Sequence, residues 1–199
     1  MKRILIAAGA AGILMPTLAS AELNYNSVNV GFTTIMSNDF AANFTELSLG
    51  VSKSVSKHVY LGASYDSGSK FLSSSSASGG GYTKVHSISL GAGFHTPLND
   101  NSDIIVAGHI GQGTDKISGS AESASVYDIG AGVRTEFPYG LEASVVAFYD
   151  SRSNDTYSSR DTFVNAQFGF NFTPEIQMYG GLDLWRDNQT VDFGLRFFY

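Results

Sequence analysis

The sequence predicts an all-β protein, an antiparallel up-and-down transmembrane β-barrel of about ten strands. Three features indicate this fold: alternation of apolar and polar residues, short turns between longer polar connections, and aromatic residues at the ends of the apolar rows. Alternation with a period of two indicates a strand that contacts lipid on one face and a lumen on the other. No stretch after residue 21 is apolar for 18 residues, so no transmembrane helix is predicted there.

The N-terminal residues predict an export signal. Lys2 and Arg3 precede an apolar run, 4–15, which Pro16 ends, and 19–21 read Ala-Ser-Ala. This run is too short to cross a membrane, and small residues at alternate positions suit signal peptidase. We therefore expect residues 1–21 to be a cleaved signal peptide and residues 22–199 to form the barrel domain.

Each predicted strand has apolar side chains at one parity and small or polar side chains at the other. The ten segments with this pattern are 28–36, 46–52, 59–66, 82–94, 104–111, 127–137, 141–149, 164–172, 176–184 and 191–199. Eight strands remain an alternative if the fifth or the ninth segment, 104–111 or 176–184, is not a strand. Both numbers fit the even strand count of single-chain bacterial barrels.

The connections between these segments alternate in character. Four are tight turns: Ser54–Lys57, Thr96–Ser102, Pro138–Gly140 and Thr173–Glu175. The others are polar and mostly longer: Ser37–Ala42, Ser67–Gly81, Thr114–Ser123, Asp150–Arg160 and Arg186–Gln189. Short turns at one end and longer loops at the other are typical of a barrel that crosses a membrane.

If the tight turns share one end, the aromatic residues of the lipid-facing rows form two girdles. The girdle at the loop end contains Tyr65, Tyr82, Tyr127 and Tyr149. The girdle at the turn end contains Phe94, Phe137, Tyr139, Phe172, Phe197 and Tyr199. A soluble β-sandwich, the alternative fold, has no reason to sort aromatic residues to strand ends, whereas membrane interfaces favour them.

Composition excludes some functions. The chain has no cysteine and a net charge of −6; without Lys2 and Arg3, ten basic residues remain against 18 acidic ones, a net charge of −8. This acidic balance argues against nucleic acid as a partner.

The C-terminal residues carry the most specific motif. Asp192, Gly194, Phe197 and Tyr199 fill the positions of a polar residue, a glycine and two aromatic residues. This spacing resembles the signal that the barrel assembly machinery of Gram-negative bacteria recognises. With the export signal and the barrel pattern, the chain resembles the small OmpA/OmpX-type porin family. The resemblance implies the bacterial outer membrane as location, and outer-membrane lipids and the assembly machinery as partners.

The predicted lumen is rich in charge, and we expect its residues to form an ion-pair network. Carboxylates greatly outnumber the two assigned cations, Arg134 and Arg196, which both lie toward the turn end. The network residues are Glu46, Asp66, Asp128, Arg134, Glu136, Glu142, Asp183, Asp192 and Arg196. Such residues either fill and brace a small barrel or line a narrow passage that prefers cations.

Catalytic and metal sites are not predicted. His58, His86, His95 and His109 lie on different segments, and no nucleophile, base and acid combine as in known outer-membrane enzymes. We expect a monomeric barrel, without cofactor or enzyme activity, with a structural or interaction role in the cell envelope. The alternative is a narrow, cation-preferring porin for small solutes, and a distant alternative is an outer-membrane hydrolase.

Overall fold

The computed structural model describes residues 25–37, 44–72, 81–117, 120–154, 158–186 and 188–199. The expected signal peptide, residues 1–21, lies outside the described residues, as do parts of the expected loops Ser37–Ala42, Ser67–Gly81, Thr114–Ser123, Asp150–Arg160 and Arg186–Gln189.

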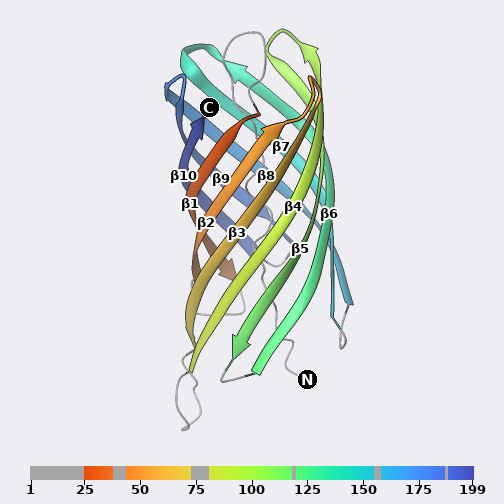
Figure 1. Ribbon diagram of the computed structural model, residues 1–199, viewed down its shortest axis with the longest axis vertical. Coiled ribbons are helices and arrows are strands. Elements are labelled where there is room, and N and C mark those ends of the chain that lie inside the picture. Colours follow the sequence, from red (N-terminus) through yellow and green to blue (C-terminus); the bar gives the residue numbers. More distant parts are fainter. Residues whose placement is uncertain (1–24, 38–43, 73–80, 118–119, 155–157, 187) are drawn as a thin grey trace.

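The described residues form ten strands that close into one antiparallel barrel (Figure 1). The strands are β1 (Ser27–Ser37), β2 (Phe44–Ser54), β3 (Val59–Leu72), β4 (Gly81–Asn99), β5 (Ser102–Ile117), β6 (Ser120–Phe137), β7 (Leu141–Ser153), β8 (Ser158–Thr173), β9 (Ile176–Leu184) and β10 (Asn188–Phe198). Each strand pairs with its neighbours in the chain, and β1 pairs with β10. The predicted up-and-down barrel is therefore confirmed.

Closure settles the strand number. β1 pairs with β10 through a continuous register that includes Val30 opposite Leu195. The two segments in question, 104–111 and 176–184, are strands and lie in β5 and β9. The alternative with eight strands is wrong. Closure leaves no strand edge unpaired, which hydrocarbon would make costly.

The two ends of the barrel differ. The short connections 55–58, 100–101, Pro138–Gly140 and 174–175 all lie at one end, called here the short-turn rim. β10 ends at this rim, at the top of Figure 1 beside the label C. Pro138–Gly140 forms one 3₁₀ turn, η1, in which Tyr139 and Gly140 have positive φ angles of 69° and 74°. No helix in the described part of the chain is long and apolar enough to cross a membrane.

Burial in the barrel is the reverse of burial in a soluble domain. Large apolar side chains on the outer face are exposed: Leu90 by 60%, Ile110 by 68% and Phe168 by 66%. Buried positions are mainly polar, for example Asn29 and Asn165, each 1% exposed. An outer face of this kind is stable only against an apolar medium, which supports the transmembrane assignment over a soluble sandwich.

Strands extend further than the sequence pattern predicts. β3 continues to Leu72, β5 to Ile117 and β7 to Ser153, so the expected loops Ser67–Gly81, Thr114–Ser123 and Asp150–Arg160 are partly strand. The prediction treated polar residues as loop. Their polarity indicates contact with water, while the ladder of backbone hydrogen bonds continues beyond the apolar band.

The girdle side chains that the structure describes lie on the outer face. Tyr65, Tyr127 and Tyr149 are 42%, 48% and 40% exposed, whereas the side chain of Tyr82 lies outside the described residues. The exposed aromatic residues near the short-turn rim are Phe94, Phe137, Tyr139, Phe172, Phe197 and Tyr199.

Candidate functional site

The lumen brings together the charged residues that the sequence analysis singles out. Nearly all are buried, with between 0% and 6% of the side chain exposed: Glu46, Asp66, Asp128, Arg134, Glu142, Asp183, Asp192 and Arg196. Glu136 differs, since it is only half-buried at the end of β6. Strand alternation explains this common orientation, because every second residue faces the interior.

One strong ion pair lies near the short-turn rim. Arg134 on β6 donates from Nε to Oε1 of Glu142 at 2.8 Å and from Nη2 to Oε2 at 3.0 Å. The Arg134 and Glu142 side chains are 2% and 4% exposed. This two-pronged geometry is the strongest form of a charge-assisted hydrogen bond.

Arg196 on β10 has different partners from those expected. Its guanidinium donates to the amide oxygens of Asn29 at 3.0 Å, Gln177 at 2.9 Å and Gln167 at 2.9 Å. It also lies 5.1 Å from the centre of the Tyr179 ring. An ion-pair network is the expected environment of Arg196, whereas side-chain amides and an aromatic face surround this fully buried cation.

Gln177 joins the two arginine sites. It accepts from Arg196 and donates from Nε2 to Oε2 of Glu142 at 3.1 Å. The Gln177 side chain occupies the space that a Cβ on Gly169 would need, so glycine on β8 makes the contact possible. The hydrogen-bonded group, called here the polar plate, consists of Asn29, Arg134, Glu142, Gln167, Gln177 and Arg196. It links β1 to five consecutive strands, β6 to β10.

Two other lumen carboxylates, Asp66 and Asp183, contact neutral donors. Asp66 accepts from Ser48 and, at 2.9 Å, from Ser87. Asp183 accepts from the Asn165 amide at 2.7 Å. These contacts satisfy buried oxygens without cations, so acidic charge exceeds basic charge along this part of the lumen.

His109 and Asp128 form a further lumen contact. The two side chains meet through Nδ1 and Oδ1, and both are buried. His86 lies on the outer side, where its ring nitrogen contacts the Tyr65 hydroxyl at 3.2 Å. Within the described ranges, no group of three or more His, Cys, Asp or Glu residues could hold a metal ion.

An aromatic group in the other half of the lumen was not predicted. Phe148 stacks on Phe163 with ring centres 5.0 Å apart, and Phe163 stacks on Trp185 at 4.1 Å. Arg152 lies 4.9 Å from the Trp185 ring and donates to Asp150 at 2.8 Å. We call Phe148, Phe163 and Trp185 the aromatic stack. In the alternating pattern, Phe148 and Phe163 fall at the lumen-facing positions of their strands. Two large aromatic residues at such positions are the sequence signal that could have revealed this group.

A second unpredicted group of buried rings lies near the short-turn rim. The rings of Tyr25 and Tyr60 stack with centres 4.8 Å apart, and His95 lies 4.0 Å from Tyr25. His58 contacts the His95 carbonyl oxygen through Nδ1 at 3.2 Å, so two histidines that are distant in sequence meet here. Tyr60 lies over Gly93, its partner on β4, where a Cβ would collide with the ring.

The C-terminal motif residues divide between the two faces of β10. Asp192 is buried, whereas Phe197 and Tyr199 are exposed by 40% and 61%. The folded barrel also requires glycine at position 194, because a Cβ there would collide with the Tyr179 hydroxyl and with the backbone of β1. The motif is thus compatible with this strand, and recognition by the assembly machinery stays a prediction.

Comparisons with known proteins agree with the observed architecture. No protein-family model matches the chain, and no curated protein is similar in sequence. The NanC porin aligns with a TM-score of 0.51 and 12% identity over 86% of this chain and 100% of that chain. The translocator domain of the autotransporter NalP from Neisseria meningitidis has a TM-score of 0.51 and 11% identity, over 87% and 88%. At these identities the similarity is one of fold, which this chain shares with small outer-membrane barrels.

Proposed function

We propose that residues 22–199 form an integral β-barrel of a bacterial outer membrane with a structural or interaction role in the cell envelope. The apolar outer face and the aromatic girdles support a membrane location. Residues 1–21 serve as export signal, and Asp192, Gly194, Phe197 and Tyr199 direct assembly. The membership in the OmpA/OmpX-type family belongs to this proposal, which includes no catalytic role.

The polar plate is the main structural feature that supports a structural role. Its hydrogen bonds cross-link side chains from β1 and β6 to β10 inside the lumen. Such a connected buried network is rigid, because breaking one contact leaves another buried polar group without a partner. Together with the aromatic stack, it fills the lumen with side chains at two levels, as expected for a small barrel that does not conduct.

The charge of the lumen favours a second candidate, a narrow pore that prefers cations. Glu46, Asp66, Asp183 and Asp192 are all buried toward the interior, and the described carboxylates exceed the arginines there. Rings of acidic side chains select cations in channels. This alternative requires that both the aromatic stack and the polar plate leave room for a hydrated ion.

Single-channel recording of the purified barrel in planar bilayers distinguishes the two candidates. The structural role predicts no resolved conductance steps from protein whose folding is verified by its heat-dependent shift on an SDS gel. Reproducible, cation-selective steps would instead establish the pore. Heat-unfolded protein at the same concentration is the control for leakage that does not require the barrel. Fractionation of cell membranes tests the location, and recovery with the inner membrane would contradict the proposal.

A further inference from the structure

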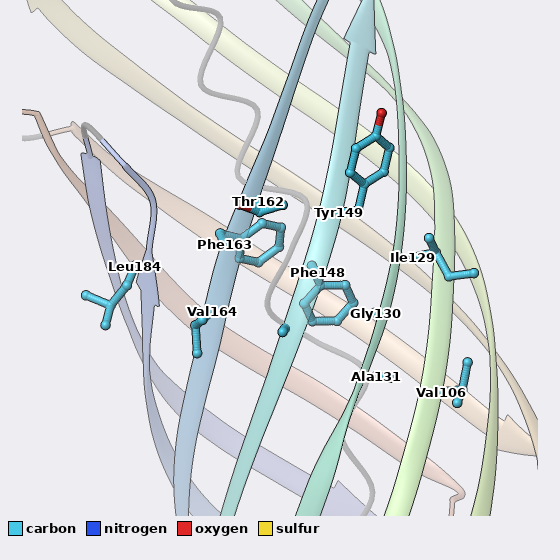
Figure 2. Close-up of a pocket in the computed structure, with 11 residues that line it drawn as sticks. Val106, Ile129, Gly130, Ala131, Phe148, Tyr149, Thr162, Phe163, Val164 and Leu184 are labelled. Atoms are coloured by element: carbon cyan, nitrogen blue, oxygen red, sulfur yellow. The ribbon is translucent and has the colours of Figure 1, made fainter.

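An apolar groove of about 610 Å³ lies across β5 to β9 (Figure 2). Most of its lining residues are exposed on the outer face, and Gly130, Phe148 and Phe163, which have the lumen-facing parity, also line it. One row of directly paired residues crosses it, from strand to strand: Val106, Ala131, Ala147, Val164 and Leu184. The two alanines lie between larger side chains, so the surface is lower at the middle of the row.

The adjacent row forms a wall on the side away from the short-turn rim. Ile129 and Tyr149 are paired with each other there, and they are 58% and 40% exposed. Both line the groove, as does Thr162, the partner of Tyr149 on β8. The groove is therefore bounded by an aromatic girdle residue and lined by apolar side chains, which suit a hydrocarbon chain.

Two cations lie beyond this end of the groove. Arg160 is exposed on β8, two residues from Thr162, and Arg186 is exposed just beyond β9, two residues from Leu184. Two residues of strand span about 7 Å, which gives the distance of Arg160 from Thr162 along β8. Neither arginine forms an ion pair within the part of the chain that the structure describes. In an acidic protein, two such cations beside an apolar groove mark a site for an amphipathic anion.

We propose that the groove and the two arginines bind one phosphate-bearing, acylated lipid of the membrane leaflet at the rim opposite the short turns. One acyl chain lies over Ala131 and Ala147, and the guanidinium groups of Arg160 and Arg186 bind the phosphate at the headgroup level. Guanidinium matches phosphate in geometry and charge. This inference rests on the proposed membrane function. A second copy of the chain offers no phosphate group to the two cations, and a dimer is one of the outcomes that the test distinguishes.

Native mass spectrometry of the barrel in detergent tests the site with lipid A, a bisphosphorylated acylated glucosamine disaccharide, as the probe. We expect retention of one lipid, with affinity about fivefold lower for Arg160→Ala or Arg186→Ala and roughly 30-fold lower for the double variant, since each cation near a membrane surface contributes about 1 kcal/mol. Ala147→Leu fills the groove and should also weaken binding. Lys84→Ala and Ala92→Leu are the matched controls, since both residues are exposed on β4, outside the groove.

The outcomes separate this inference from the proposed function. Dephosphorylated lipid A should bind the wild type as weakly as lipid A binds the double arginine variant. Equal retention of lipid A by Arg160→Ala/Arg186→Ala and Lys84→Ala would overturn the site, as would a dimer that Ala147→Leu dissociates. A correctly folded barrel without lipid binding refutes only this inference. Failure of the wild type to insert into lipid vesicles refutes the membrane function itself.

Discussion

Replacing Arg134 by methionine should destabilise the barrel by about 3–5 kcal/mol, the cost of leaving one member of a buried ion pair without its partner. Methionine keeps much of the length and volume of the side chain, so the change removes charge and hydrogen bonds more than packing. Glu142, 4% exposed, would retain its contact with Gln177 at 3.1 Å but lose both bonds from the guanidinium.

The double variant separates the cost of a buried unpaired charge from a general loss of packing. Glu142→Gln alone should also cost up to about 3–5 kcal/mol, because it leaves the buried Arg134 guanidinium without a carboxylate, although one amide oxygen remains as acceptor. In Arg134→Met/Glu142→Gln neither member of the ion pair remains charged, so neither is left without its partner. The double variant should therefore lose less stability than the two single variants combined, with a coupling energy of about 1–3 kcal/mol.

Urea titration of barrels reconstituted in lipid vesicles measures these free energies, with the heat-dependent gel shift as the measure of folded protein. Lys53→Met is the matched control, because Lys53 is an exposed cation near the same rim. Purely additive losses, or a loss for Arg134→Met no larger than that of the control, would refute the role assigned to the plate. All three plate variants should remain without conductance in planar bilayers if the lumen is braced rather than open.

Two further substitutions test the faces of the barrel and the terminal motif. Leu90→Arg places a charge on the lipid-facing side at mid-depth and should cost about 2–4 kcal/mol, measured by the same titration. Ser89→Thr, on the lumen face of the same strand, should cost much less, and equal costs would contradict the assigned faces. Replacing Phe197 and Tyr199 by Ser should prevent assembly into the outer membrane, measured by membrane fractionation. Normal amounts of heat-resistant barrel would show that the motif is not needed.

The barrel itself follows from a simple physical rule, which is why its strands are predictable from sequence. A strand between lipid and lumen must alternate, and this pattern located all ten strands, including β5 and β9. The ends of the strands are harder to predict, since residues such as Ser69 and Ser153 are polar in both a loop and a water-exposed strand. Backbone pairing there depends on the neighbouring strand and not on the local side chains.

The lumen was predictable in composition but not in its pairing. Parity alone indicated that Arg134, Arg196 and the carboxylates face inward, and the structure places them there. It could not indicate that Arg196 contacts amides, because Gln177 and Gln167 reach it from two other strands. Partner choice depends on the stagger between strands, and stagger depends on turn geometry that a single sequence specifies weakly.

Glycine positions could help to predict which lumen residues contact each other, because large lumen residues lie over glycines of adjacent strands. Phe148 is paired with Gly130 and Tyr60 with Gly93, and in each case a Cβ on the glycine would collide with the ring. A narrow barrel has no free volume for two large side chains at one level, so a ring on one strand requires a small residue beside it. A register that aligns inward rings with inward glycines therefore fits better than one that places a ring beside another large side chain. Applied to β6 and β7, this criterion places Phe148 opposite Gly130 or Gly132, two glycines of the same parity, and rejects the shift that places it opposite Asp128.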